Sequence, residues 1–277
     1  FIKSCNDIIS IVVDPQTDDM KAYLAYAKAN RAALYLDLAR LFEPLENNYT
    51  DVSKVKGLTV PKIIETPTEA EARNNPRLPR QEMYDFILED LTSAEELLTG
   101  NSHTAGKDVP SLAVVYGLKA RYYMWLGDYA NAKDYARKAI NAASTTVMTE
   151  KQCLDVATGF NNINLWMWGS QMMSEDDVVK TGIINWASWM CNEAEYGYAA
   201  AEPMTMIDAA MYNRLNNTDF RKKMFKAPAG HELSGQEVYI SDAFAKYIPT
   251  YGAIKFRPNE GNDEEYTIGS ATAFPLM

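Results

Sequence analysis

A cluster of aromatic and polar side chains in the second half of the chain has the residue types and spacing best suited to binding chemistry. Sugars present flat C–H faces rimmed by hydroxyl groups, so a Trp or Tyr ring can stack on the face while amides and carboxylates bind the rim. Within thirteen residues the sequence places Trp186, Trp189, Tyr196, Tyr198, Asn192 and Glu193. We predict that these six residues form a carbohydrate-binding platform.

The rings of this cluster have an alternative role, because Trp and Tyr side chains are usually well buried and some of them could belong to the core. Trp125, Trp166 and Trp168 are expected to be buried in this way, since the first follows a helical pattern and the others lie in a predicted strand. The cluster itself follows neither a helical nor a strand period. That placement favours an exposed, irregular segment.

Residues 44–80 form a second candidate binding segment. Five prolines are spread along it with many polar residues between them, which predicts a long irregular excursion rather than packed structure. Loops of this length inside a compact domain are usually functional. Tyr49 and the pair Asn47-Asn48 would supply sugar contacts, but the segment has few rings and would also suit contact with a protein.

The sequence lacks the common motifs for nucleophilic catalysis and for phosphate binding. The motifs GxGxxG, GxxxxGK[ST], GxSxG and HExxH are all missing, and His103 and His231 are the only imidazoles. Both histidines lie in loops rich in Gly, Ser and Thr, where a solvated side chain is expected. A Ser-His-Asp triad assembled from distant residues stays open as an alternative.

Paired carboxylates, which a glycosidase needs about 5 to 9.5 Å apart, are represented by Glu193 and Glu195. Two positions apart, they share neither a helix face nor one side of a turn, so hydrogen-bonding carboxylates are the expected role. Asp263-Glu264-Glu265 is interpreted as a charged loop, with calcium binding as the alternative. We predict that the protein is not an enzyme and needs no cofactor.

The composition of the chain disfavours some classes of partner and some kinds of site. A formal net charge of -10 and a pI of about 4.8 disfavour nucleic acid, whose phosphates would be repelled. Cys5, Cys153 and Cys191 show neither metal-ligand spacing nor an even disulfide framework. The sequence contains no apolar run of about 18 residues that would predict a membrane span. A hydrophobic fraction of 47% indicates an ordinary globular core.

The elements that must position these candidates are helical in the first half. Residues 20–42 predict a long helix ended by Pro44, after a shorter helix over residues 2–13. The apolar face of the long helix is predicted to contain Tyr23, Ala27, Asn30, Leu34, Leu38 and Leu41. A further amphipathic helix, which stops at Gly100, is predicted from Tyr84, Ile87, Leu91, Ala94 and Leu98.

A helical hairpin of tetratricopeptide type follows. Its two helices are predicted from Val115, Leu118, Tyr122 and Trp125, and from Tyr129, Ala132, Ala136 and Ala139. Gly127-Asp128 makes the turn, and the alanines let the two helices approach closely. Stacked helix pairs bury their faces against neighbours, so the earlier helices are expected to extend the array.

The pattern changes after about residue 145. Residues 164–168 and 237–240 predict short strands, residues 206–215 predict one helix, and turn residues become frequent. We therefore expect a mostly α fold with two parts. Residues 1–145 form a tetratricopeptide-like helical scaffold with a long loop at 44–80, and residues 146–277 form an irregular ligand-binding subdomain that returns to the helical core near its end.

The order of these segments resembles that of the SusD/RagB family. Residues 29–42 carry the Arg-Ala-x-x-Tyr-x-x-Leu pattern of the family's long helix, from Arg31 to Leu38, ahead of a proline-containing loop. Residues 83–91 are similar to its next helix, and the hairpin at Gly127 falls where the family has a tetratricopeptide unit. Residues 165–168, 219–223 and 255–257 are similar to later elements.

The resemblance implies a lipid-anchored, outward-facing protein of the outer membrane in a Bacteroidetes-type polysaccharide utilisation system. The implied partners are an oligosaccharide or polysaccharide and a SusC-like TonB-dependent transporter. Family members are considerably longer at both ends, so we expect the chain to be a truncated member whose signal and anchor lie outside it. The family's ligand-contacting aromatics lie on variable loops, so no site residue transfers by motif.

A tetratricopeptide-type adaptor that binds peptide in a helical groove, with no sugar site, is the alternative. Helix pairs are scaffolds for many functions, so a single hairpin does not decide between the two. The long aromatic, aperiodic second half favours the glycan-binding interpretation.

Overall fold

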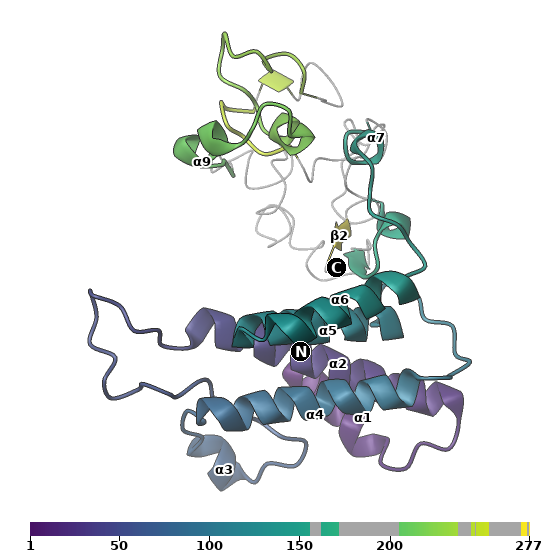
Figure 1. Cartoon of the computed structure of the whole chain (residues 1–277). Coiled ribbons are helices and arrows are strands. Elements are labelled where there is room, and N and C mark those ends of the chain that lie inside the picture. Colours follow the sequence, from purple (N-terminus) through teal and green to yellow (C-terminus); the bar gives the residue numbers. More distant parts are fainter. Residues whose placement is uncertain (156–161, 172–204, 238–244, 247, 255–272, 276) are drawn as a thin grey trace. The chain divides into compact units, whose positions relative to one another are not determined.

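A computed structural model (Figure 1) describes residues 1–155, 162–171, 205–237, 245–246, 248–254, 273–275 and 277. The chain forms two compact units, one made of Phe1–Ser144 with Met277 and the other of Thr145–Leu276. Among the helices of the described residues, none is both long and apolar enough to cross a membrane.

The first unit is an array of packed helices, as predicted. Its helices are α1 (Ile2–Ile11), α2 (Asp18–Phe42), α3 (Glu69–Arg73), α4 (Arg80–Leu98), α5 (Leu112–Leu126) and α6 (Tyr129–Ala142). The helix α2 packs against α1, α4 and α5, while α5 packs against α4 and most extensively against α6. Figure 1 shows α2, α4, α5 and α6 side by side along their lengths. The predicted mostly α class is confirmed.

The buried face of the long helix α2 is displaced from the one predicted, although the predicted residue Ala27 is buried. Tyr23 and Leu41, which were expected to face the core, are 52% and 74% exposed. The most completely buried positions lie one or two residues earlier in the sequence and are mainly small: Ala22, Ala25, Ala29, Ala32 and Ala39. Three neighbouring helices contact α2, and alanine at these positions allows their axes to come close.

The predicted hairpin is present as α5 and α6. Gly127 ends α5 in the left-handed conformation, with φ 78°, and the Asp128 side chain accepts a hydrogen bond from the backbone N–H of Asn131 to begin α6. Two details of the prediction are wrong. Tyr129, the first residue of α6, is 72% exposed, and Trp125 is only half-buried. The indole N–H of Trp125 donates to the hydroxyl of the buried Tyr84 at 2.9 Å.

The segment 44–80 is irregular apart from α3, as predicted, but it is not unpacked. Thr59 and Val60 are buried, and Leu58 forms an isolated antiparallel bridge with Pro79. The Tyr35 hydroxyl on α2 donates to the carbonyl of Ile63 and accepts from its N–H. Side chains of the helices therefore hold the backbone of this segment, which the sequence pattern did not reveal.

The second unit contains short elements among irregular chain, in line with the prediction. These are α7 (Glu150–Cys153), the 3-10 turns η1 (Ile163–Leu165) and η5 (Phe220–Met224), α9 (Ala209–Arg214), and strands β1 (Gly169–Gln171) and β2 (Ala273–Pro275). The two strands pair antiparallel, with Gly169 opposite Pro275.

The strand predicted over 164–168 is misplaced. Ile163–Leu165 forms a 3-10 turn, and the strand begins only at Gly169. Trp166 and Trp168 are nevertheless buried as predicted, at 4% and 6% exposure. Burial of these rings produced the apolar pattern that was mistaken for a strand. The second predicted strand, 237–240, lies outside the described residues except for Glu237.

Candidate functional site

The predicted platform falls outside the described part of the chain. Trp186, Trp189, Asn192, Glu193, Tyr196 and Tyr198 all lie in the range 172–204, as do Glu195 and Cys191. The charged run Asp263-Glu264-Glu265 lies in the range 255–272, which is also not described. The roles predicted for all these residues therefore stay predictions.

The tip of the segment 44–80 displays one aromatic ring on a structured turn. Tyr49 is 94% exposed. The Asn47 side-chain oxygen accepts hydrogen bonds from the backbone N–H groups of Tyr49 and Thr50, at 2.8 and 2.9 Å. Lys56 and Glu46 form an ion pair across the base of the tip, at 2.7 Å. The turn presents Tyr49 to solvent, where a sugar face could stack on it.

A buried arginine anchors this segment to three helices. The Arg31 guanidinium donates to both carboxylate oxygens of Asp90, at 2.7 and 2.9 Å, and each of the two side chains is 3% exposed. It also donates to the Asn6 side-chain oxygen at 2.8 Å and to Glu65 at 2.5 Å. Arg31 thereby joins α1, α2 and α4 to the segment 44–80 at Glu65. We call these four side chains the arginine clamp.

Within the arginine clamp, two opposing effects act on Glu65. Partial burial acts to raise the pKa of its carboxyl, but a backbone hydrogen bond and the hydrogen bond from Arg31 outweigh burial, so the pKa is lowered. The Asn6 amide donates to the carbonyls of Ile63 and Ile64, next to Glu65, at 3.1 and 3.0 Å. The chain just before the carboxylate is thus held by α1.

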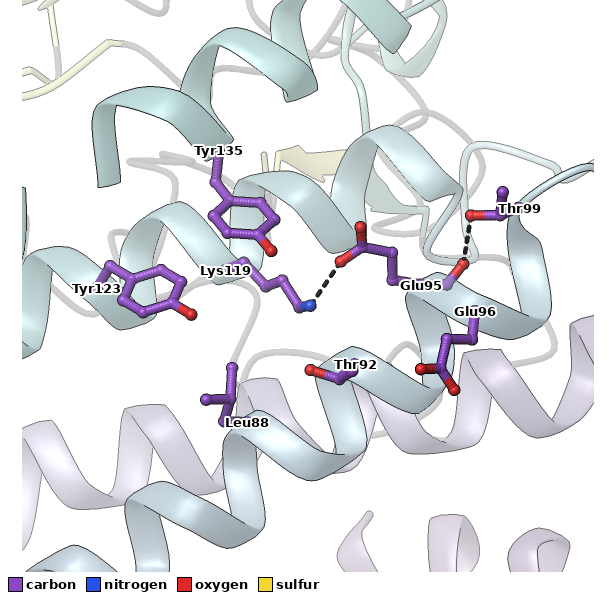
Figure 2. A pocket seen from close by; sticks show the side chains of 8 residues that line it. All are labelled: Leu88, Thr92, Glu95, Glu96, Thr99, Lys119, Tyr123 and Tyr135. Carbon is purple, nitrogen blue, oxygen red and sulfur yellow. Dashed lines mark hydrogen bonds and ion pairs between the residues drawn. The ribbon is translucent and has the colours of Figure 1, made fainter. Parts of the chain in front are cut away.

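A groove that was not predicted from the sequence opens between α4, α5 and α6 (Figure 2). It has a volume of about 520 Å³. Its lining residues are Leu88, Thr92, Glu95, Glu96 and Thr99 from α4 and its C-terminal end, Lys119 and Tyr123 from α5, and Tyr135 from α6. We call it the α4–α6 groove. The spacing of its α4 residues places them on one helix face.

Two tyrosines and a lysine form the inner wall of the α4–α6 groove. The rings of Tyr123 and Tyr135 are stacked, with centroids 5.5 Å apart and planes 16° apart. The Lys119 side chain is 3% exposed, and its ammonium donates to Glu95 at 2.5 Å and lies 5.1 Å from the Tyr135 centroid. Burial raises the pKa of both tyrosines, so their hydroxyls stay protonated at neutral pH and can donate as well as accept.

The described histidines are held by neighbouring side chains. His103 is not the solvated side chain predicted: it is 21% exposed, its Nδ1 lies 2.7 Å from an Asp19 carboxylate oxygen, and its ring packs edge-on to Tyr23. The His231 ring lies against Tyr212, with centroids 5.6 Å apart. In the part of the chain that the structure describes, no three His, Cys, Asp or Glu side chains gather as metal ligands.

In comparisons with known proteins, the chain matches solved structures but no family model and no curated protein. The matching structures include a SusD-like carbohydrate-binding protein from Bacteroides vulgatus, with a TM-score of 0.68 and 21% identity over 100% of this chain and 52% of that one.

A SusD superfamily protein from Bacteroides thetaiotaomicron matches with a TM-score of 0.67 and 17% identity, over 98% of this chain and 56% of that one. A structure described as containing a xylogluco-oligosaccharide matches with a TM-score of 0.62 and 16% identity, over 100% of this chain and 55% of that one. The chain thus spans about half the length of these proteins. At this level of identity the likeness concerns the fold, and it confirms the resemblance noted in the sequence: the chain has the SusD-like fold.

Proposed function

We propose that this chain is a SusD-like, non-catalytic protein that binds an oligosaccharide or polysaccharide at the cell surface. The bound glycan would pass to a SusC-like TonB-dependent transporter, and the protein would be held by a lipid anchor on the outer face of the outer membrane. The observation that carries the proposal is the SusD-like fold along the whole chain. The saccharide in one of the similar structures supports glycan as the ligand class.

In this proposal the two parts of the chain have different roles. Residues 1–145 form the rigid scaffold, whose helices bury their side chains against one another. Residues 146–277 supply the main ligand-binding surface, with Trp186 and Trp189 stacking on the sugar faces. Tyr49, displayed at the tip of the segment 44–80, is a second aromatic contact. Several separate stacking contacts give a modest affinity for each sugar unit, and together they retain a long chain.

No covalent step is part of this function. Binding energy concentrates the glycan near the transporter, and the sugar leaves unchanged. The sequence contains neither the GxSxG nor the HExxH motif of serine hydrolases and zinc proteases. A glycosidase would show new reducing ends, so product analysis separates the two classes.

The test is a binding screen of the purified protein against plant, host and microbial polysaccharides, by affinity electrophoresis followed by calorimetry. Wild type is compared with Trp186→Ala, Trp189→Ala and Tyr49→Ala. Binding without product formation that is weakened by the tryptophan variants supports both the function and the platform. If only Tyr49→Ala weakens binding, the site lies on the segment 44–80. If the protein binds no glycan, the proposal is refuted.

A peptide-binding adaptor is the second candidate, and the α4–α6 groove is the observation that favours it, because it lies on a tetratricopeptide-type hairpin. An adaptor would bind no glycan in the screen and would retain peptides from an array. The same purified protein serves both measurements.

A further inference from the structure

We propose that the α4–α6 groove is itself a saccharide-binding site, selective for a neutral sugar unit and separate from both the predicted platform and the segment 44–80. This inference rests on the proposed function and adds a binding position on the helical scaffold. Its volume of about 520 Å³ lies within the range of small-molecule pockets, about 300 to 1,000 Å³.

The wall of the groove offers unused hydrogen-bonding groups. Figure 2 shows the hydroxyls of Tyr123 and Tyr135 directed toward the space above α4. Neither hydroxyl has a hydrogen-bond partner among the residues that the structure describes. Thr92 adds a hydroxyl from the α4 side. A hydroxyl both donates and accepts, which matches a ligand whose own rim consists of hydroxyls.

The charges in the groove favour a neutral ligand. The Glu95 carboxylate is already paired with Lys119, and Glu96 adds one further negative charge. The Lys138 ammonium lies close by, 4.5 Å from the Tyr135 centroid. These two carboxylates and two ammonium groups balance, so the groove and its edge carry no excess charge that would attract an anion or a cation. A polar ligand without net charge can still accept and donate hydrogen bonds there.

The groove is also organised before any ligand arrives. The Lys119 ammonium is held by Glu95, and the stacked rings of Tyr123 and Tyr135 fix each other across the closely packed pair α5 and α6. Few side chains would have to be immobilised on binding, which lowers the entropic cost of association.

The test combines hydrogen–deuterium exchange with calorimetry on the full chain, using short malto-, cello-, xylo- and manno-oligosaccharides as probes. Wild type is compared with the double variant Tyr123→Phe/Tyr135→Phe, which removes both hydroxyls and keeps the stacked rings. Tyr116→Phe is the matched control, because its ring lies 6.2 Å from Tyr135 but does not line the groove.

We expect at least one neutral oligosaccharide to slow exchange in residues 88–99 and 119–135 of the wild type. The double variant should lose this protection, with a Kd raised about tenfold, equivalent to about 1.4 kcal/mol. Tyr116→Phe should retain the exchange protection and the Kd of the wild type. An equal effect of Tyr116→Phe would overturn the proposal, because it would indicate general packing rather than ligand contact.

The remaining outcomes separate the groove from the proposed function. Saccharide binding that leaves both segments unprotected overturns the groove site while glycan capture stands. If a lysine-rich peptide slows exchange in these segments and no saccharide does, the groove is a peptide site and the saccharide proposal is overturned. If the wild type binds no saccharide in this panel or in the polysaccharide screen, both the groove site and the proposed function are refuted.

Discussion

Replacing Asp90 with asparagine would remove the negative charge from the core of the arginine clamp while keeping the shape of the side chain. Arg31 and Asp90 are each 3% exposed and joined by two hydrogen bonds, so the guanidinium loses a partner that water cannot replace. The new amide also directs N–H groups toward a side chain that can only donate. Breaking a buried ion pair in this way costs about 3 to 5 kcal/mol.

Glu65 remains as a second anion on Arg31, at 26% exposure, and this places the expected loss for Asp90→Asn near the lower end, about 3 kcal/mol. Urea unfolding followed by far-UV circular dichroism measures the change, and trypsin cleavage after Lys62, which is half-buried with its ammonium over the Phe86 ring, reports release of the segment 44–80. Asp7→Asn is the matched control. Asp7 pairs with Lys3 on the surface of α1, so its loss should change stability by less than about 1 kcal/mol.

Two results would refute this reasoning. If Asp90→Asn and Asp7→Asn destabilise the protein equally, burial does not set the strength of the clamp. If the double variant Arg31→Met/Asp90→Leu is no more stable than Asp90→Asn, the loss does not come from an unpaired buried charge, since an apolar pair of similar volume should restore much of the stability.

Three further predictions follow from single residues. Tyr49→Ala should weaken glycan binding in calorimetry without shifting the urea midpoint, because the ring is 94% exposed; a shifted midpoint would show that the ring supports the fold. Because the pKa of Glu65 is lowered on folding, its contribution to stability is present above its ordinary value of 4.5 and is lost as the pH falls through the lowered pKa. Protease sensitivity of the segment 44–80 should rise in that acidic window, and Glu65→Gln should be sensitive at every pH. Gly127→Ala should destabilise the hairpin by about 1 to 2 kcal/mol in thermal unfolding, since φ is 78° there; an unchanged Tm would argue against that backbone strain.

Regular apolar spacing made the helices predictable from the sequence. In α4 the predicted residues Tyr84, Ile87, Leu91 and Ala94 are all buried, because large side chains on one face dominate the pattern. In α2 the same method chose a face that is displaced from the buried one. The buried stripe there consists largely of alanines, whose weak hydrophobicity is outweighed by exposed residues such as Tyr23 and Leu41.

The contacts that join distant parts of the chain could not be predicted in the same way. Arg31 and Asp90 are 59 positions apart, and nothing local to either residue indicates a buried pair. The α4–α6 groove likewise needs three helices in place before Glu95, Lys119 and Tyr135 come together. A partial signal was available, since the α4 positions 88, 92, 95 and 99 follow a helical period on the face next to the core residues Ile87 and Leu91.

The attachment of the segment 44–80 has a consequence for protein engineering. Its fixed points are Glu43, whose carboxylate accepts from the Tyr84 hydroxyl, the bridge between Leu58 and Pro79, and the arginine clamp near Glu65. Residues 45–57 lie between the first two of these points and are largely exposed. Exposed loop tips tolerate insertion and replacement well. This tip is therefore a grafting position, where turns of different length and ring content can be exchanged on a constant helical frame.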